Sequence, residues 1–475
     1  MSESTTGAEF LLGIEEYLRY INQDRQADSI HTLSRTFASE DVLRNTIRSF
    51  MQDLSSILQD NFKDLADLLH GVVKSNDTNR VLLQYLGKQI NQQDLKDLIY
   101  ANIKSNNNQT IYKNLLQYLG KQVNDQDLKD LIYATIKSET NELALKALCQ
   151  FISKKIENKF TKDLIHGITR SDDPSKSVCQ YCSNNIEDKD VKDLIHGFIK
   201  SENDLVKYKA LLNYVGQNIE NQSLSDLSKA ISRSIDSKDF ENDFIKYYLA
   251  MLDRRYSSDK LFRGINNLIK SDVKRTIIND IFSRGQIRSK IWLIEELMKI
   301  ETNYDNVLVL AGWFGQFKSI YEKKCTYSKM RIVEIDKHAC ETSDYIFNLS
   351  NLENHKVKSV LADINNLTLH KNGYEWTISN FKDKNVYQEK FSPNLIINTS
   401  AEHMTEEWFN QIRFKELEND PIIAIQSNNL FDIPEHVNCV YSIDHMKKKF
   451  PLSRILYEGE LQLKGYKRVM MIGRI

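Results

Sequence analysis

The chain has 475 residues, more than one hydrophobic core usually serves, so two or three domains are expected. Hydrophobic residues make up 41% and charged residues 27%, as in ordinary soluble globular proteins. The formal net charge of −1 provides no basic excess, which disfavours nucleic acid or an anionic membrane as the partner. No apolar run approaches the roughly 20 residues that span a bilayer.

The N-terminal sequence MSESTTGAEFLLGIEEYL lacks the positively charged start and the continuous apolar stretch of a signal peptide. We therefore expect a cytoplasmic, reducing setting, in which the six cysteines are free thiols.

Repeats occupy much of the first half of the chain. LLQYLGKQINQQDLKDLIYANIKS at 82–105 recurs as LLQYLGKQVNDQDLKDLIYATIKS at 115–138. Weaker copies place an aspartate at steps of 30 or 33 residues: Asp67, Asp97, Asp130, Asp163, Asp193 and Asp226. An aromatic residue keeps the same steps: Tyr85, Tyr118, Phe151, Tyr181 and Tyr214. A period near 33 is typical of an α-helical solenoid, in which each pair of helices covers the apolar face of its neighbour.

The repeat register explains a motif that could be mistaken for a chemical site. Cys179 and Cys182 form a CxxC, the spacing of a redox motif or half of a zinc site. Both align with leucine and other apolar positions of the other repeats, so we interpret them as core residues. The array itself then offers a recognition surface for a substrate or a protein partner, or else a spacer or an assembly element.

The sequence predicts four segments. Residues 1–60 form an N-terminal helical cap, residues 61–235 the repeat array of about six units, and residues 236–285 a helical cap or connector. Residues 286–475 form an α/β domain that opens with an amphipathic helix at 289–297.

Five apolar runs in this last segment predict parallel strands, at 307–310, 331–336, 357–361, 393–400 and 421–428. Two further runs within 453–475 are joined around Lys464 and Gly465, which predicts a hairpin and hence an antiparallel pair at the sheet edge.

Residues suited to a nucleotide-type cofactor follow these strands. Gly312 and Gly315 come directly after the first strand and let the backbone turn tightly and approach a ligand. The second strand ends on Glu334 and Asp336, whose carboxylates could accept hydrogen bonds from both hydroxyls of a ribose. Asp363 follows the third strand.

With the glycine turn AGWFG at 311–315, these acids, the segment NTSAEHM at 398–404 and the terminal hairpin, the last 190 or so residues resemble the class I S-adenosylmethionine-dependent methyltransferases. The resemblance implies a Rossmann-like fold with S-adenosyl-L-methionine as cofactor. It implies that Gly312, Trp313 and Gly315 line the cofactor. It also implies that Asp336 or Glu334 accepts hydrogen bonds from the ribose hydroxyls, and that Asp363 accepts a hydrogen bond from the adenine amino group.

Two departures from the family pattern matter. The usual third glycine is replaced by the GWFG form, and no Asn-Pro-Pro-aromatic tetrad occurs, which disfavours methylation of amino groups on DNA bases.

The segment after the fourth strand lies where an acceptor would be bound. Methyl transfer is an in-line displacement that depends on alignment, and a hydroxyl or amine acceptor must also lose a proton. We therefore predict His403 as a general base and Glu402 as the acid that orients it or binds the acceptor, with Asn398 beside the cofactor. Alternatively, His403 packs on the cofactor or caps the next helix. His436, His445 and Asp444 lie in later loops and are weaker candidates, and no ligand spacing in this half predicts a metal site.

The predicted function is therefore a cytoplasmic methyltransferase whose acceptor is a small molecule, a glycan or a protein in preference to nucleic acid. Transfer of a 3-amino-3-carboxypropyl group from the same cofactor remains open. A nicotinamide-dependent oxidoreductase shares the strand–glycine–helix–strand–acid order, but its GxGxxG is missing here. The non-enzymatic alternative is a solenoid scaffold whose α/β domain binds the cofactor without turnover.

Overall fold

The computed structural model describes residues 7–36, 42–59, 62–105, 107–138, 141–170, 173–201, 203–347, 356–379 and 386–475. The chain forms two compact units, Ser39–Tyr248, and Met1–Ala38 together with Leu249–Ile475. The predicted domain boundary between residues 60 and 61 falls outside the described residues, and the other boundaries stay predictions. Among the helices of the described ranges, none is long and apolar enough to cross a membrane.

In the part of the unit Ser39–Tyr248 that the structure describes, helix follows helix, as the repeats predict. Asparagine or aspartate residues begin several of these helices, where their side chains accept hydrogen bonds from first-turn amides. The helices are α3 (Val42–Leu58), α4 (Lys63–Lys74), α5 (Thr78–Gln89), α6 (Gln93–Lys104), α7 (Asn108–Gln122), α8 (Gln126–Lys137), α9 (Glu142–Lys155), α10 (Lys159–Arg170), α11 (Pro174–Asn185), α12 (Lys189–Lys200), α13 (Asp204–Asn218), α14 (Gln222–Ser234) and the first half of α15 (Phe240–Arg255).

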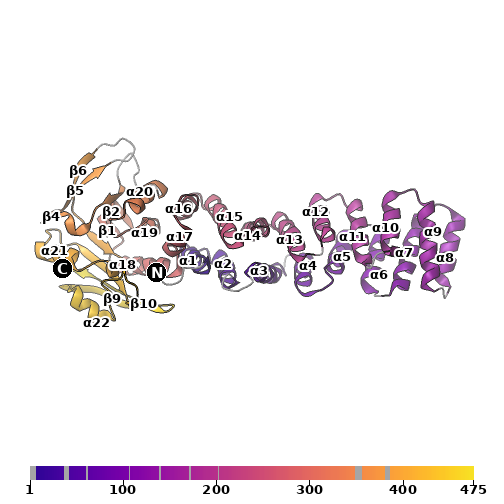
Figure 1. Cartoon of the computed structure of the whole chain (residues 1–475), viewed down its shortest axis with the longest axis horizontal. Coiled ribbons are helices and arrows are strands. Elements are labelled where there is room, and N and C mark those ends of the chain that lie inside the picture. The colour runs from indigo at the N-terminus through magenta and orange to yellow at the C-terminus, as the bar shows by residue number, and fades with distance from the viewer. Residues whose placement is uncertain are drawn as a thin grey trace. The chain divides into compact units, whose positions relative to one another are not determined.

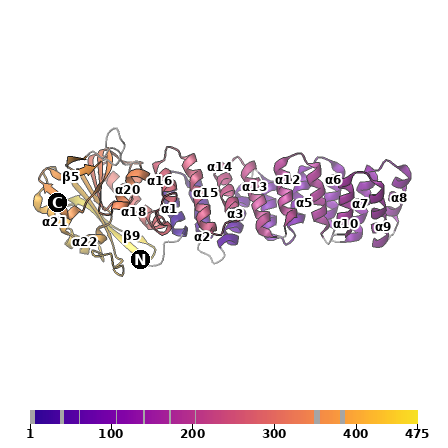
Figure 2. The ribbon, with the colours of Figure 1, turned by 45° about the horizontal axis from the view of Figure 1, so that its top comes forward.

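The helical array reverses direction between α8 and α9. Figures 1 and 2 show α9–α14 returning beside α3–α8. The repeated aromatic residues of α3–α8 pair with those of α9–α14, and the first of the series pairs with the last. The Tyr85 and Tyr214 hydroxyls lie 2.7 Å apart, and those of Tyr118 and Tyr181 lie 3.0 Å apart. Phe151, the middle member of the series, is at the reversal and 46% exposed. The repeats therefore bury their apolar faces against sequence neighbours and also against the opposite half.

The core interpretation of the cysteine pair is confirmed. Cys179 and Cys182 are both fully buried, and all six cysteines are free thiols.

The second unit includes five helices near its α/β domain: α1 (Gly7–Tyr20), α2 (Asp24–Thr36), α16 (Lys260–Ile269), α17 (Arg275–Ile281) and α18 (Arg284–Ile300). The first helix packs against the later ones. The Tyr17 hydroxyl donates to Asp259 Oδ2 at 2.8 Å, and a Cβ on Gly13 would lie 1.8 Å from the Phe282 carbonyl oxygen. The absence of a side chain at Gly13 is thus what allows α1 to approach so closely.

A seven-stranded sheet forms the centre of the α/β domain. It contains β1 (Asn303–Leu310), β2 (Thr326–Glu334), β3 (Val357–Leu361), β7 (Leu395–Asn398), β8 (Ile422–Asn428), β9 (Arg454–Leu463) and β10 (Tyr466–Arg474) in the order β3-β2-β1-β7-β8-β10-β9. Strands β1, β2, β3, β7 and β8 run parallel to one another, whereas β10 is antiparallel to both β8 and β9. The predicted parallel strands and the terminal hairpin at the sheet edge are confirmed.

One strand end differs from the prediction. Strand β2 stops at Glu334, two residues before Asp336, because the Asp336 side chain accepts from the Ala339 amide at 3.1 Å and begins helix α20 (Lys337–Ile346). The other helices beside the sheet are α19 (Gln316–Tyr321), α21 (Glu407–Lys415) and α22 (Ile443–Lys449), with one-turn 3₁₀ helices η1 (Ile364–Asn366) and η2 (Ala401–His403).

A second, antiparallel sheet was not predicted. It consists of β4 (Thr368–His370), β5 (Gly373–Ser379) and β6 (Val386–Phe391). Tyr374, Trp376 and Ile378 alternate along β5 and are buried, so the period-two pattern was present in the sequence. Their side chains join the same apolar cluster as the ends of β1 and β7.

Candidate functional site

The candidate site lies where the order of the parallel strands reverses. Within the sheet, β2 and β3 lie on one side of β1, and β7 and β8 lie on its other side. Leu310 is in register with both Val333 and Asn398, so the carboxyl ends of β1, β2 and β7 share one edge. In open α/β sheets this reversal is where ligands bind.

The glycine turn after β1 has an unusual backbone. Ala311 and Trp313 have positive φ angles of 49°, and Gly315 has 75°. Residues other than glycine adopt this region rarely, and they stay there only where their surroundings hold them. The amide of Trp313 donates to Glu334 Oε2 at 2.7 Å, which provides one such restraint.

The two acids at the end of β2 have different surroundings. Glu334 is 7% exposed, and its two oxygens accept from the amides of Trp313 and Asp336, at 2.7 and 2.9 Å. Each carboxylate oxygen still has a lone pair for a further donor. Asp336 is exposed and caps α20. The structure therefore couples Glu334 to the glycine turn and Asp336 to a helix.

Asp363 serves the turn that follows β3. It is half-buried and accepts from the amide of Asn365 at 2.9 Å and from Asn366 Nδ2 at 3.1 Å. These contacts fix its carboxylate at the same edge of the sheet as Glu334, because Glu334 and Leu361 are in register.

Asn398 is fully buried at the end of β7. Its Oδ1 accepts from the Ser400 amide at 2.9 Å, and its Nδ2 lies 3.4 Å from Met404 Sδ. Both contacts are to the segment that follows, so Asn398 holds the turn that carries Glu402 and His403.

Glu402 lies in η2 and is 2% exposed. Its Oε1 accepts from Asn428 Nδ2 at 2.9 Å and lies 3.5 Å from the guanidinium of Arg468, which is itself buried and donates to the Thr399 carbonyl at 2.9 Å. Its Oε2 is buried and has no hydrogen-bond partner among the described residues. A buried carboxylate oxygen without a partner is costly and needs an explanation.

His403 is exposed and faces His436. The two rings lie 4.5 Å apart at an angle of 86°, and Nδ1 of His403 is 3.2 Å from the Glu435 carbonyl oxygen. Burial lowers the pKa of His436, whose Nδ1 is 3.1 Å from the Leu430 carbonyl oxygen. Within the described part of the chain no hydrogen bond joins Glu402 to His403, so these two residues are close without forming the oriented pair that a base and its carboxylate would make.

Sequence reasoning did not place His436 beside this segment. The amide of Asn438 donates to the Glu402 carbonyl at 2.9 Å, and Asn438 Nδ2 donates to the Met404 carbonyl at 2.9 Å. These contacts bring the loop after β8 onto η2. No local sequence pattern predicts these contacts, because they join segments more than 30 residues apart.

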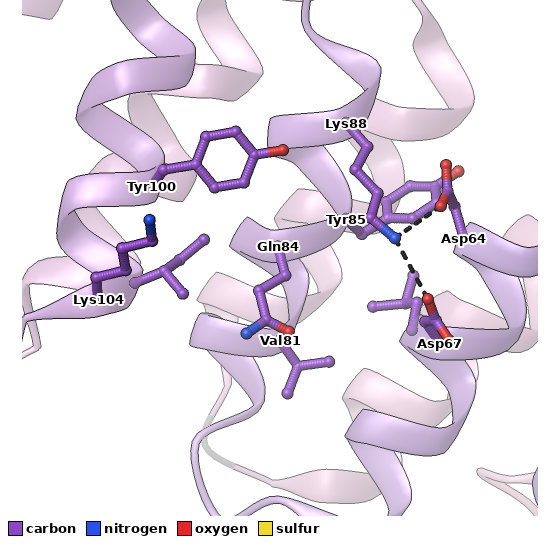
Figure 3. Close-up of a pocket in the computed structure, with 10 residues that line it drawn as sticks. Asp64, Asp67, Val81, Gln84, Tyr85, Lys88, Tyr100 and Lys104 are labelled. Carbon is purple, nitrogen blue, oxygen red and sulfur yellow. Dashed lines mark hydrogen bonds and ion pairs between the residues drawn. The ribbon is translucent and has the colours of Figure 1, made fainter.

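The helical array contains a pocket between α4, α5 and α6 (Figure 3). Its volume is about 330 Å³, and it is lined by Asp64, Asp67, Leu68, Val81, Gln84, Tyr85, Lys88, Tyr100, Ile103 and Lys104. The Lys88 ammonium donates to Asp64 at 2.7 Å and to Asp67 at 3.3 Å, and Lys121 repeats the contact with Asp94 at 2.6 Å in the next unit. Because the arrangement recurs, these charges serve to join adjacent repeats.

Comparison of the chain with known proteins yields distant matches among solved structures. No family model matches the sequence, and no curated protein matches it. Among solved structures, an S-adenosylmethionine-dependent methyltransferase from Leishmania major is 18% identical, and the match covers 45% of this chain and 81% of that one with a TM-score of 0.30.

Two other solved structures illustrate the range of the matches. Magnesium protoporphyrin IX methyltransferase from Synechocystis, solved with bound S-adenosylmethionine, is 9% identical over 48% of this chain and 96% of its own, with a TM-score of 0.30. Spermidine synthase from Thermotoga maritima is 18% identical over 39% of this chain and 58% of its own, with a TM-score of 0.26. The strand order, five parallel strands and antiparallel terminal hairpin give the C-terminal domain the class I methyltransferase fold that the sequence indicates.

Proposed function

We propose that this chain is an S-adenosylmethionine-dependent methyltransferase, with the cofactor bound at the carboxyl ends of β1, β2 and β3. The main support for the proposal is the hydrogen bond from the Trp313 amide to Glu334. This bond holds a buried carboxylate against the glycine turn, at the point where the strand order reverses. Both oxygens of Glu334 keep acceptor capacity, so the residues fit a ligand with two adjacent hydroxyl groups.

Each residue has a defined task in this proposal. Glu334 accepts from the ribose hydroxyls, in preference to Asp336, and Asp363 accepts from the adenine amino group. The turn at 311–315 presents backbone to the methionine part of the cofactor, and Asn398 holds the segment that faces the acceptor. The bound cofactor would supply an electrophilic methyl group on a sulfonium, and its reaction depends chiefly on alignment with the acceptor atom.

The acceptor and the role of the array form a second part of the proposal. We assign the acceptor to small molecules, glycans or proteins, since the net charge of −1 provides no general attraction for nucleic acid. The helical array would select this acceptor or bind a protein partner.

The test is calorimetric titration of the chelator-treated full chain with S-adenosylmethionine, S-adenosylhomocysteine and NAD. We expect one equivalent of each of the first two to bind. Glu334→Gln should weaken binding by about 10- to 100-fold, because an amide cannot accept from both the backbone amides and a ribose diol. Asp336→Asn should have a smaller effect.

Glu341→Gln is the matched control, since Glu341 is exposed on α20, 3.8 Å from Lys337, and its variant should bind as the wild type does. Binding of NAD alone would place the chain with the oxidoreductases. Failure of all three ligands to bind would favour the scaffold hypothesis.

Gly312→Ala is expected to reduce S-adenosylmethionine affinity about 10-fold or more, because a displaced turn no longer presents its backbone to the ligand. A Cβ at this position would lie 2.1 Å from Ile332 Cγ2, in a buried region, so the turn or β2 must shift. Overpacking of this kind also destabilises a fold by about 1–3 kcal/mol.

Gly465→Ala separates these two effects. Gly465 has a φ of 82° and nothing within 4 Å of an added Cβ, so alanine there strains the hairpin turn by about 1 kcal/mol and leaves the glycine turn intact. Equal losses of affinity in the two variants, measured by the same calorimetry, would show that general destabilisation explains the result.

A further inference from the structure

We propose that Glu402, His403 and His436 bind one divalent transition-metal ion at the edge of the sheet beside the proposed cofactor site. One potential ligand atom from each of the three side chains lies within 4.8 Å of the other two. Two residues follow β7 and the third lies in the loop after β8, so the site is formed by two neighbouring strand ends.

The first argument is the state of Glu402. Its Oε1 is held by Asn428 and by Arg468, whereas its Oε2 is buried and unpartnered among the described residues. Leaving one oxygen of a carboxylate at 2% exposure without a partner is costly, and a cation or a donor at that oxygen would remove this cost. The two imidazoles each place a potential ligand atom within 4.8 Å of one of the Glu402 carboxylate oxygens.

The second argument is the tautomer that each imidazole must adopt. Nδ1 of His403 faces the Glu435 carbonyl at 3.2 Å, and Nδ1 of His436 faces the Leu430 carbonyl at 3.1 Å. A carbonyl oxygen can only accept, so both Nδ1 atoms carry the proton. Both Nε2 atoms then present a lone pair, and a carbonyl partner on the other ring nitrogen is the usual arrangement for histidines that bind metals.

The donor set identifies the class of ion. Two imidazole nitrogens and one carboxylate oxygen favour zinc and the other first-row divalent ions over calcium and magnesium, and three protein ligands leave coordination positions open. Ligand atoms around such an ion lie about 3–4 Å apart, so binding requires a small contraction of the cluster. His403 is exposed and can supply this movement by rotation.

The open positions would hold an oxygen of the acceptor, and this step rests on the proposed methyltransferase function. Coordination lowers the pKa of a bound hydroxyl or water. In that case His403 positions the acceptor through the ion, and it does not act as the general base that the sequence predicts.

The test is titration of chelator-treated full chain with Zn²⁺ by calorimetry and with Co²⁺ by visible absorption, both without S-adenosylmethionine. We expect one equivalent of each ion to bind. His403→Ala and His436→Ala should each weaken binding by at least about 10-fold, and Glu402→Gln tests the carboxylate with minimal change of shape. Circular dichroism melts check that each variant is folded.

His445→Ala is the matched control, because His445 lies in the same domain, where its ring stacks on Tyr441 and its Nδ1 accepts from the Tyr441 amide, and it is outside the cluster. This variant should bind both ions as the wild type does. The proposal is overturned if the wild type takes up neither ion, or if folded His403→Ala and His436→Ala bind with unchanged affinity. Because no methyl donor is present, this result is independent of the cofactor titration.

Discussion

Replacing Arg331 by leucine is expected to lower the free energy of unfolding of the α/β domain by about 3–5 kcal/mol, because it leaves a largely buried carboxylate without its cation. Arg331 is 1% exposed, and its Nε and Nη2 each donate to Glu389 at 2.7 Å. Burial alone would raise the pKa of Glu389, but the hydrogen bonds and charge of Arg331 outweigh it and lower that pKa.

This ion pair joins the two sheets, since Arg331 is on β2 and Glu389 on β6. All four tryptophans of the chain, at positions 292, 313, 376 and 408, belong to the unit that contains these sheets. Tryptophan fluorescence during denaturant unfolding therefore reports on this unit alone.

Two variants sharpen the measurement. Lys329→Ala removes a half-buried lysine that also contacts Glu389, at 3.2 Å, and should change stability by less than about 1 kcal/mol. The double variant Arg331→Leu/Glu389→Leu removes both charges and should recover most of the loss. A single variant as stable as the wild type would mean that the buried pair is not what attaches the second sheet.

Much of the α/β domain could be predicted because its signals are local. Continuous apolar runs identify buried parallel strands, and β8 matches its predicted run to within one residue. The glycine turn was likewise predictable, since Gly315 does adopt a left-handed conformation. The end of β2 was not, because it depends on whether Asp336 continues a strand or caps a helix, and a capping hydrogen bond decides between them.

Contacts between distant segments explain the rest. The period of the repeats predicts stacking between sequence neighbours, but the pairing of Tyr85 with Tyr214 depends on the reversal after α8, which no repeat encodes. In the same way, the approach of His436 to His403 depends on Asn438 binding the η2 turn. The spacing of residues along the chain therefore gave no reason to expect a metal site there.

Lys290→Met is expected to raise the free energy of unfolding at pH 7 by on the order of 3 kcal/mol. Lys290 lies on α18 with its ammonium buried and donating to Gln286 Oε1 at 2.7 Å. Burial lowers its pKa from 10.5 to about 7, and the charge of Arg468 on β10 adds to this, while Asp280 on α17 and Glu402 on η2 oppose it. Methionine has a similar length and no charge to bury.

The sign of the pH dependence follows from the two pKa values. Between about pH 7 and pH 10.5 the Lys290 amine is protonated in the unfolded chain but not in the folded chain. The free energy of unfolding of the wild type therefore rises with pH across this window, and it falls again as the pH is lowered to 7. The advantage of Lys290→Met, measured by tryptophan fluorescence in denaturant at pH 7, 8, 9 and 10, should therefore shrink steadily. Lys464→Met, at an exposed position in the terminal hairpin of the same unit, should differ from the wild type by less than about 1 kcal/mol at every pH. If the free energies of unfolding of Lys290→Met and of the wild type instead change with pH in parallel, Lys290 keeps an ordinary pKa in the folded protein. The polar groups around it, Arg468 and Glu402 among them, would then stabilise its charged form as well as water does.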